Sequence, residues 1–436
     1  MSPLLGSSDR TTNRRAIEAL RAGVPNRDAV RQLGCSHPEL EARFATLLGQ
    51  VRDSTNTAPP VPGILVAGDF GAGKSHLLEY FQHTSLEQNF VCSKVVISKE
   101  TSLADPVKLF RAAVGALQAP GRVGAGIANV AARLGFSRPE YLDFFRWAAP
   151  EVSGLAPHFA GSLYTFEHGG DMEFRSRIER FWAGDPLTNR ELGDKLGQLG
   201  ERTTYPLQKL PAARALAYQR FRFLARLIVA AGYDGWIILI DEVELIGQYS
   251  FKTRARAYAE LARWMGLLSE PDDRHVTGLG VVAAVTSDFE KAVITGGKMD
   301  AEYVPGKLRA SAKDEDHALA SAAERGMRFI RRNAEHLPLL SEEHVRQTFD
   351  QIRDIYERAY GWKPPTTSRL PVIGTSSVMR SFVRLWITEW DISRLFQGAS
   401  FEPEATPLQP ATYREDKDLE ADMPDGNASA QNSPGQ

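Results

Sequence analysis

The sequence has few cysteines, no long apolar run and almost no net charge. Its two cysteines, Cys35 and Cys92, are far apart and lack the spacing of a disulfide framework or a zinc site. Lys and Arg number 52 against 54 Asp and Glu, so a net charge of −2 gives no global attraction to nucleic acid or an anionic membrane. Apolar runs such as 236–240 and 281–285 are far shorter than the roughly 20 residues of a membrane span. A cytoplasmic protein without a signal peptide is therefore expected.

The 436 residues are expected to divide into four regions. With 43% hydrophobic and 24% charged residues, the composition is that of a globular chain of two or three folding units. Apolar residues at helical spacing, followed by a Pro-rich stretch, define residues 1–52 as a helical N-terminal unit. Residues 53–300 are expected to form the core, with a helical insertion at about 120–229, and residues 301–397 a helical lid. Residues 398–436 are acidic and rich in Pro, Ser and Asn, which predicts a disordered tail.

The pattern of the core predicts an α/β fold. Four apolar runs have the length and bounds of buried strands: 63–68, 91–98, 236–240 and 279–285. Segments with apolar residues at helical spacing lie between them. This alternation predicts a parallel sheet with helices on both faces, in three layers. In such a sheet ligands bind at the carboxyl ends of the strands.

A glycine-rich loop follows the first of these strands. Residues 68–75 read Gly-Asp-Phe-Gly-Ala-Gly-Lys-Ser and match the Walker A pattern GxxxxGK[ST]. The glycines let backbone N–H groups face phosphates, Lys74 is expected to reach the β- and γ-phosphates of ATP, and the Ser75 hydroxyl to bind Mg²⁺. The alternative is a plain glycine-rich turn. The candidate ATP-binding residues are Gly68, Asp69, Phe70, Gly71, Ala72, Gly73, Lys74, Ser75 and His76.

Two adjacent carboxylates end the third predicted strand. Residues 237–242 read Ile-Ile-Leu-Ile-Asp-Glu, the Walker B pattern. Asp241 is expected to hold Mg²⁺ through water, and Glu242 to polarise the attacking water as general base. An apolar run that ends in Asp-Glu is often just a strand leaving the core, so the Walker A motif upstream is what favours the catalytic interpretation. A nucleotide-binding scaffold needs Asp241 alone, and Glu242 therefore favours hydrolysis.

Together these motifs resemble those of the AAA+ ATPases, particularly the branch that contains the origin-recognition replication initiators. The resemblance implies a P-loop NTPase core and three further site residues. Thr286, at the end of the next strand, takes the place of sensor 1, the residue that orients the lytic water. The alternative interpretation is that Thr286 only caps the following turn. In the lid, Arg380 takes the place of sensor 2, with Arg384 in reserve. Arg309 takes the place of an arginine finger, which a subunit supplies to the site of its neighbour. A solvated or salt-bridged side chain is the alternative for these arginines.

Several segments are similar to the ATP-binding proteins of BREX bacteriophage-defence systems. They are residues 14–25, 68–76, 324–328, 379–380 and 386–391. Many ATPases share the P-loop and the Asp-Glu pair, so the first and last segments make the assignment specific. The resemblance implies ATP binding and hydrolysis in a multi-protein assembly, with a helicase or methyltransferase component of the same system as partner. The insertion at about 120–229 departs from a compact AAA+ core.

The predicted function is that of an ATP- and Mg²⁺-dependent ATPase that drives or switches a defence assembly. Two other functions stay open: an ATP-dependent assembly scaffold that does not hydrolyse, and a DNA-binding ATPase resembling replication initiators or helicase loaders. DNA and a second copy of the chain are accordingly candidate partners. One basic helix face is either a solvated surface or a contact for DNA phosphates. It comprises Arg214, Arg220, Arg222 and Arg226.

Overall fold

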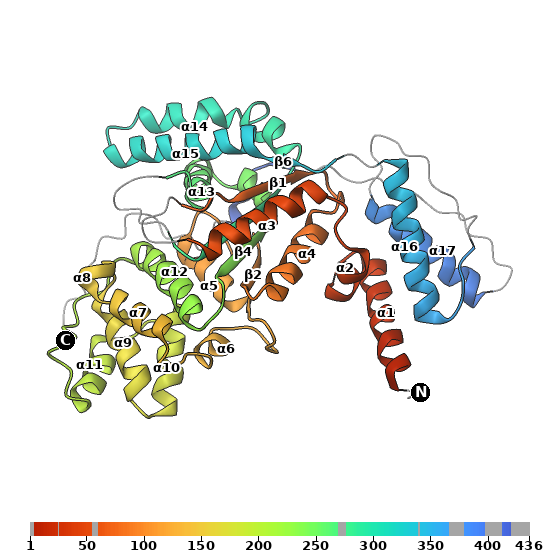
Figure 1. Cartoon of the computed structure of the whole chain (residues 1–436). Coiled ribbons are helices and arrows are strands. Elements are labelled where there is room, and N and C mark those ends of the chain that lie inside the picture. The colour runs from red at the N-terminus through yellow and green to blue at the C-terminus, as the bar shows by residue number, and fades with distance from the viewer. Residues whose placement is uncertain are drawn as a thin grey trace.

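A six-stranded sheet lies at the centre of the molecule (Figure 1). The computed structural model describes residues 4–24, 26–54, 60–268, 276–338, 341–365, 379–396 and 412–419. The strands are β1 (Ile64–Gly68), β2 (Val91–Val96), β3 (Leu117–Gln118), β4 (Trp236–Asp241), β5 (Leu279–Thr286) and β6 (Glu335–His336). Their order is β3-β2-β4-β5-β1-β6, and all neighbours run parallel except β2 and β3.

The four predicted strands are confirmed as β1, β2, β4 and β5. β1, β4 and β5 are buried along their whole length, as expected of apolar strands that are covered on both faces. The register pairs Gly68 with Thr286 and Val96 with Asp241, so the carboxyl ends of these strands align at one edge. β3 and β6 have only two residues each, too few to leave a pattern in the sequence.

Helices cover both faces of the sheet. Ile64 and Val66 of β1 pack with α3 and α4 on one face, whereas Leu65 and Ala67 belong to the core on the other. This alternation follows from the two-residue period of a strand. The helices are α3 (Pro38–Arg52) and α4 (Lys74–Glu87), and opposite them α5 (Pro106–Gly115), α12 (Ala213–Ala230), α13 (Phe251–Trp264), α14 (Asp300–Arg309) and α15 (Asp314–Asn333). In the described part of the chain, no helix combines the length and apolar character that a bilayer crossing requires.

A group of short helices is inserted between β3 and α12. It consists of α6 (Ala128–Ala131), α7 (Pro139–Trp147), α8 (Pro150–Ser153), α9 (Pro157–His168), α10 (Met172–Ala183) and α11 (Asn189–Gln198). Its interior is aromatic: the Phe159 ring lies 5.4 Å from that of Phe181 and 4.8 Å from that of Phe223. Because Phe223 belongs to α12, the inserted helices share one hydrophobic core with the sheet.

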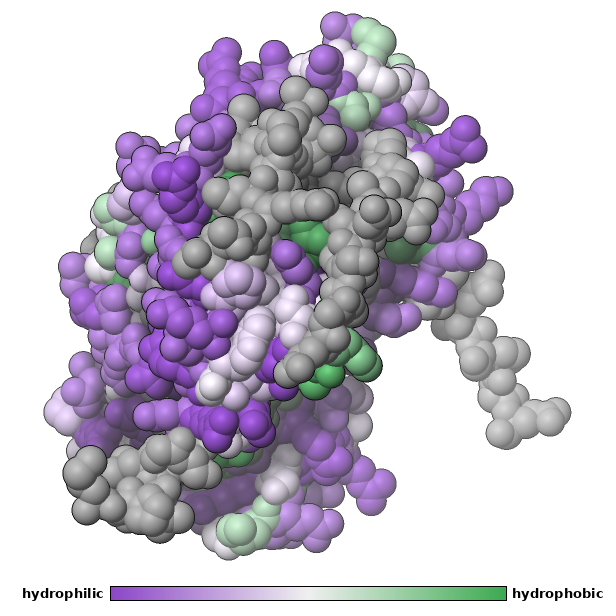
Figure 2. Space-filling view, turned by 90° about the vertical axis from the view of Figure 1, so that its right-hand side faces the viewer, coloured by the Kyte–Doolittle hydropathy of each residue, from purple (hydrophilic) through white to green (hydrophobic). Residues whose placement is uncertain are grey.

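Helices from opposite ends of the chain form a second body, which we call the lid. It contains α1 (Leu4–Ala22), α2 (Arg27–Leu33), α16 (Glu342–Tyr360) and α17 (Met379–Leu395). Figure 1 shows α1 and α2, in red, beside α16 and α17, in blue. Ala16 and Ile17 pack against Trp386, Ile387 and Trp390 in a separate hydrophobic core. The surface that faces the viewer in Figure 2, on this side of the molecule, is mainly hydrophilic.

This grouping differs from the division expected from the sequence. Within residues 1–52, α1 and α2 join the lid, but α3 packs on the sheet. Within residues 301–397, α15 packs directly on α13: a Cβ atom at Gly326 would lie 2.0 Å from the carbonyl oxygen of Tyr258. Helical spacing reveals the apolar face of a helix but not the partner of that face, so the sequence pattern could not show these contacts.

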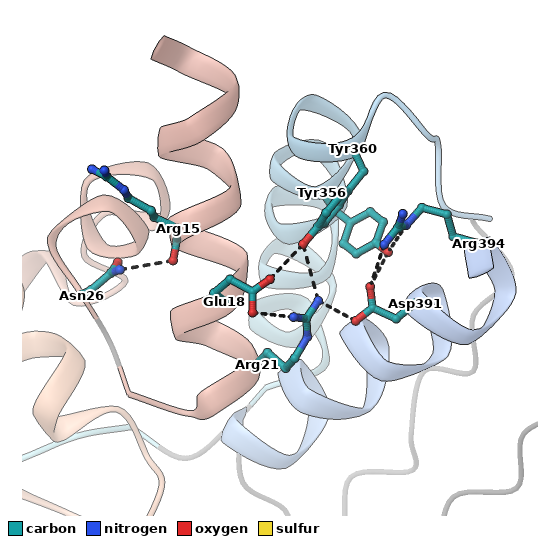
Figure 3. A network of polar contacts seen from close by, with 8 residues as sticks. All are labelled: Arg15, Glu18, Arg21, Asn26, Tyr356, Tyr360, Asp391 and Arg394. Carbon is teal, nitrogen blue, oxygen red and sulfur yellow. Dashed lines mark hydrogen bonds and ion pairs between the residues drawn. The ribbon is translucent and has the colours of Figure 1, made fainter. Parts of the chain in front are cut away.

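Polar contacts join α1 to α16 and α17 (Figure 3). A guanidinium nitrogen of Arg21 lies 2.6 Å from the Asp391 carboxylate. The Tyr360 hydroxyl donates to Glu18 at 3.2 Å, and the Tyr356 hydroxyl donates to Asp391 at 2.7 Å. The first and last segments of the BREX resemblance, far apart in the sequence, are thus in direct contact.

A short C-terminal segment, residues 412–419, lies against the core and ends in η3 (Lys417–Leu419). The Asp416 N–H donates to the Gln248 carbonyl at 2.9 Å, and Glu415 pairs with Arg254 at 2.9 Å. For these residues the expected disorder was wrong, because an acidic side chain meets a buried arginine. The remainder of the expected tail lies outside the described residues.

Candidate nucleotide-binding site

The Walker A loop connects β1 to α4 with the backbone that phosphate binding requires. Gly71 and Gly73 have φ angles of 77° and 103°, in the left-handed region that favours glycine. α4 begins directly afterwards at Lys74. Free N–H groups of a helix N-terminus attract anions, so this loop can surround phosphate groups with donors.

Lys74, the first residue of α4, folds its side chain back onto this loop. Its ammonium group donates to the carbonyl oxygens of Gly68 and Asp69, at 2.7 and 3.1 Å. Only 8% of Lys74 is exposed, and burial lowers the pKa of its ammonium group. A charged group held here is positioned for an anion, and an anion would in turn stabilise the charge.

Asp241 and Ser75 meet at the end of β4. The Ser75 hydroxyl donates to the Asp241 carboxylate at 2.8 Å. A hydroxyl and a carboxylate in contact are the protein ligands that Mg²⁺ takes beside phosphates. No group of three His, Cys, Asp or Glu side chains suited to a metal occurs among the described residues, but phosphate and water oxygens supply most ligands of such a site. The residues present therefore fit Mg²⁺.

Glu242 follows Asp241 in an unusual backbone conformation. Its φ angle is 60°, one of three positive values among the described non-glycine residues. Its N–H donates to Asp241 at 3.0 Å, and its side chain is exposed at the cavity next to Lys74. Partial desolvation and the Asp241 carboxylate raise the pKa of Glu242. A sterically disfavoured conformation that presents a carboxylate is the kind of strain found at functional sites.

A cavity of about 290 Å³ lies between the Walker loop and the lid. Residues 70–77 and Asp241, Glu242 and Glu244 form its sheet side, which we call the sheet wall. The opposite side, the lid wall, contains Ala19, Leu20, Gly23, Leu33, Cys35, Ser36, His37, His344, Thr348, Gln351, Met379, Arg380 and Val383. The four helices of the lid and the segment after α2 thus form the side of the cavity that faces the sheet.

The lid wall combines apolar side chains with histidines. The rings of His37 and His344 lie edge to face at 6.2 Å. Burial lowers the pKa of both imidazoles, with a further contribution from His344 to that of His37, so both are neutral near pH 7. His76 connects the two walls: its ring contacts the Gly34 carbonyl at 3.0 Å and holds α4 on the segment after α2.

The predicted lid arginine reaches the cavity. The Arg380 guanidinium lies 5.4 Å from the ring centroid of Phe70, an exposed residue of the Walker loop. This cation–π contact connects the first turn of α17 to the loop. Ser377 and Val378, which precede it in the predicted helix, lie outside the described residues. Arg384 does not line the cavity.

Arg309 lies elsewhere on the core. Both of its terminal nitrogens contact the Glu324 carboxylate at 2.7 Å, in a half-exposed pair on α14 and α15. The structure therefore does not bring Arg309 to the cavity of its own chain, and its pair with Glu324 is the salt-bridged alternative stated for this arginine.

Thr286 ends β5 beside Gly68, outside the set of residues that line the cavity, and contacts the C-terminal segment. Its hydroxyl lies 2.9 Å from that of Tyr413, which in turn donates to Asp288 at 3.0 Å. Tyr413 has no signal in the local sequence, because it stands in a stretch that reads as disordered.

Glu244 is a second residue of the site that sequence reasoning missed. It lies in η1 (Val243–Gln248) after Walker B and lines the cavity. Its Oε2 atom is buried and has no hydrogen-bond partner in the described structure. Burial raises the pKa of Glu244 to about 7. A third acidic residue in the run Asp-Glu-Val-Glu was the available signal.

The four arginines of the basic face of α12 contact other residues of the same chain. Arg220 is 6% exposed and donates to the Asp185 carbonyl at 2.8 Å, and Arg226 lies 4.4 Å over the Trp147 ring. The other two arginines contact Glu260 and the Ser153 carbonyl. These contacts attach α12 to its neighbours, a role that the charge pattern does not predict.

The fold and the site together define a class. A mixed α/β protein with a mostly parallel sheet, a glycine loop before α4, and Ser75 against a strand-end aspartate is compatible with a P-loop NTPase. A family model described as "BREX system ATP-binding protein BrxC/D" matches residues 9–129 and 213–369, which is most of the chain. The chain belongs to this family, and ATP binding in a BREX system is the role that the family describes. No curated protein and no solved structure matches the chain.

The two matched blocks leave out residues 130–212. This gap contains α7 to α11, the greater part of the inserted helices. By contrast, α2, α16 and most of α1 in the lid lie inside the match, as do both walls of the cavity apart from α17. The insertion is thus an addition to the part of the fold that the family model describes.

Proposed function

We propose that this protein hydrolyses ATP with the help of Mg²⁺, and that hydrolysis drives or switches a BREX assembly. One observation carries the proposal. Glu242 presents its carboxylate at the cavity, next to the Asp241–Ser75 contact, at the cost of a left-handed backbone. A scaffold that only binds nucleotide does not need this second carboxylate.

In the proposed complex, residues 68–75 surround the triphosphate and Lys74 contacts the β- and γ-phosphates. The nucleoside occupies the lid wall, where Leu20, Leu33 and Val383 offer apolar contacts and the neutral His37 and His344 offer ring faces. Apolar surface with a few polar groups is typical of small-molecule sites.

Mg²⁺ would be held by Ser75 and, through water, by Asp241, and when bound it neutralises charge on the phosphates. Glu242 accepts a hydrogen bond from the attacking water and takes its proton as the water oxygen bonds to the γ-phosphorus, while the bond from that phosphorus to the β–γ bridging oxygen breaks and ADP leaves. Its raised pKa makes it a stronger base than a solvated glutamate. Thr286, at the end of the adjacent strand, orients the same water.

Arg380 would couple the lid to the nucleotide. It stands beside Phe70 at the mouth of the loop, where a γ-phosphate would attract it away from the ring. Loss of that phosphate removes the attraction, so the position of α17 would report the nucleotide state.

The partners that we propose are other BREX components, such as the helicase or methyltransferase component, with DNA as a further candidate and the cytoplasm as location. In an oligomer, Arg309 of one copy would serve the cavity of the next. Its in-chain partner Glu324 would release it on assembly.

Steady-state turnover with Glu242→Gln tests the proposal. The variant keeps shape and should bind a fluorescent ATP analogue as the wild type does, while turnover falls by about 10²- to 10⁴-fold, the usual contribution of a general base. Glu302→Gln, at an exposed position of α14 away from the cavity, is the matched control and should behave as the wild type.

The rival functions give different results. A scaffold binds ATP in both proteins and hydrolyses it in neither, with or without DNA. A DNA-loading ATPase shows DNA affinity that falls steeply with salt concentration.

A further inference from the structure

The C-terminal segment 412–419 reaches the edge of the sheet where the proposed chemistry takes place. It lies on η1, the turn after Asp241 and Glu242, and on the residues that follow β5. Gln248 of η1 donates its side-chain amide to the Thr412 carbonyl at 3.0 Å and accepts from the Asp416 N–H at 2.9 Å. These two hydrogen bonds fix the segment on both sides of Tyr413.

Two further contacts hold the segment in register. The Tyr413 ring lies edge to face with that of Phe289 at 5.8 Å, and it covers Gly247, where a Cβ atom would come within 2.6 Å of the ring. Glu415 lies 2.9 Å from Arg254, which is 3% exposed and also pairs with Asp300 at 2.7 Å. A glycine that fits a ring and a buried arginine that faces two carboxylates are features of a built docking site.

The hydrogen-bond directions at Tyr413 follow from its neighbours. The Asp288 carboxylate only accepts, so the single hydrogen of the Tyr413 hydroxyl is donated to Asp288 at 3.0 Å. Tyr413 oxygen must then accept in its 2.9 Å contact with Thr286. Burial and the carboxylates of Asp288 and Glu244 raise the pKa of Tyr413, so the phenol keeps its hydrogen.

The hydroxyl of Thr286 therefore donates its only hydrogen to the Tyr413 oxygen. What remains on Thr286 is its lone pairs, and a lone pair can accept from a water molecule but cannot donate to a phosphate oxygen. A water that donates one hydrogen to Thr286 and the other to Glu242 turns its own lone pair toward the phosphorus.

We infer that Tyr413 is a positioning residue, which fixes Thr286 as a hydrogen-bond acceptor for the attacking water. The C-terminal segment thereby completes the hydrolytic site from a distance of more than a hundred residues along the chain. This inference rests on the proposed function, in which Thr286 and Glu242 orient that water. No proton leaves Tyr413 or Thr286 in the reaction.

The test compares Tyr413→Phe, Thr286→Val and the double variant in steady-state ATP turnover. Tyr413→Phe removes one hydroxyl and should lower kcat by about 3- to 10-fold, the effect of one hydrogen bond, with the KM for ATP unchanged. Thr286→Val should lower kcat by at least as much. The double variant should equal Thr286→Val alone, because Tyr413 acts through Thr286. Tyr303→Phe, at an exposed hydroxyl on α14, is the control and should leave kcat unchanged.

Each other outcome overturns the inference. A kcat of Tyr413→Phe that equals or exceeds that of the wild type would mean that the segment does not assist the site, and additive losses in the double variant would mean that Tyr413 acts independently of Thr286. A wild type without turnover under any condition refutes the proposed function and this inference with it. Hydrogen exchange of peptide 412–419 distinguishes failure of the proposed function from failure of the docking, because a docked segment is protected in the wild type whether or not ATP is hydrolysed.

Discussion

The two walls of the cavity are built in different ways. The sheet wall consists of the loop and first residues of α4, which follow β1, and of residues at and after the end of β4. Both strands pair with β5 in one sheet, and this places Lys74 and Ser75 next to Asp241. The lid wall consists of helices whose sequence separation exceeds 300 residues, as in the contact of Arg21 with Tyr360. The first wall is built on a hydrogen-bonded sheet, whereas the second depends on side-chain packing and ion pairs.

Because the two walls are built differently, we expect them to have different roles. The sheet wall belongs to the hydrophobic cores on both faces of the sheet, but the lid has its own core around Trp386 and Trp390. A body with its own core can open without disturbing the sheet. We therefore expect the sheet wall to supply chemistry and the lid wall to supply the conformational response.

The largest effect should come from breaking the lid core alone. Trp386 is fully buried, and its ring lies 5.1 Å from that of Phe349. Trp386→Ala leaves a large cavity and should destabilise the lid by about 3–5 kcal/mol. Hydrogen exchange should accelerate in α1, α16 and α17 and stay unchanged in β4 and β5, while affinity for ATP falls.

Trp236→Ala is the matched comparison in the sheet. Trp236 is equally buried, but it belongs to β4 and donates to Ser93 at 2.9 Å. The same substitution there should accelerate exchange in the strands as well. If Trp386→Ala loosens β4 and β5 to the same extent, the lid is not a separate unit and the comparison of the walls is wrong.

A smaller effect is expected in the sheet wall at Glu244. Its pKa is raised to about 7 from an ordinary value of 4.5, so the folded state favours the neutral carboxyl. The stability linked to this group is fully present below pH 4.5 and is lost as the pH rises through 7. Glu244→Gln stays neutral, and should exceed the wild type in unfolding free energy by about 1–3 kcal/mol at pH 8.

At pH 4.5 the two proteins should have the same stability. Thermal unfolding of both at each pH measures the difference, and contributions from other titrating groups cancel because both proteins share them. A stability difference that does not change between the two pH values would mean that Glu244 does not titrate in this range.

The contrast between the walls also explains what the sequence could predict. Walker A and Walker B are local patterns attached to long apolar strands, so Lys74, Ser75 and Asp241 were found with their strand ends. Tyr413 and His37 contribute through contacts between distant segments, and neither stands in a recognisable motif. The ATP-binding family could be recognised from α1 and α17, but the sequence did not reveal that these helices touch.

A double-mutant cycle on the ion pair between α1 and α17 tests how the lid is held. Arg21 and Asp391 are partly exposed and 2.6 Å apart, within a network that includes Tyr360. Arg21→Ala and Asp391→Asn should each cost about 1 kcal/mol of lid stability, with a coupling energy of about 0.5–1 kcal/mol. Thermal unfolding of the two single variants and the double variant gives this coupling. Additive costs would show that packing alone holds the lid.

The smallest effect on stability should come from Arg309, which belongs to neither wall. Its pair with Glu324 is half exposed and contributes little, so Arg309→Ala should change the unfolding free energy by less than about 0.5 kcal/mol. If Arg309 serves the cavity of a neighbouring copy, turnover per chain should nevertheless fall, and wild-type turnover should rise with protein concentration. Arg309→Lys keeps a charge but not the bidentate geometry and should also lose turnover. Equal turnover in all three proteins at every concentration would exclude Arg309 from the reaction and leave the two walls of a single chain to carry it.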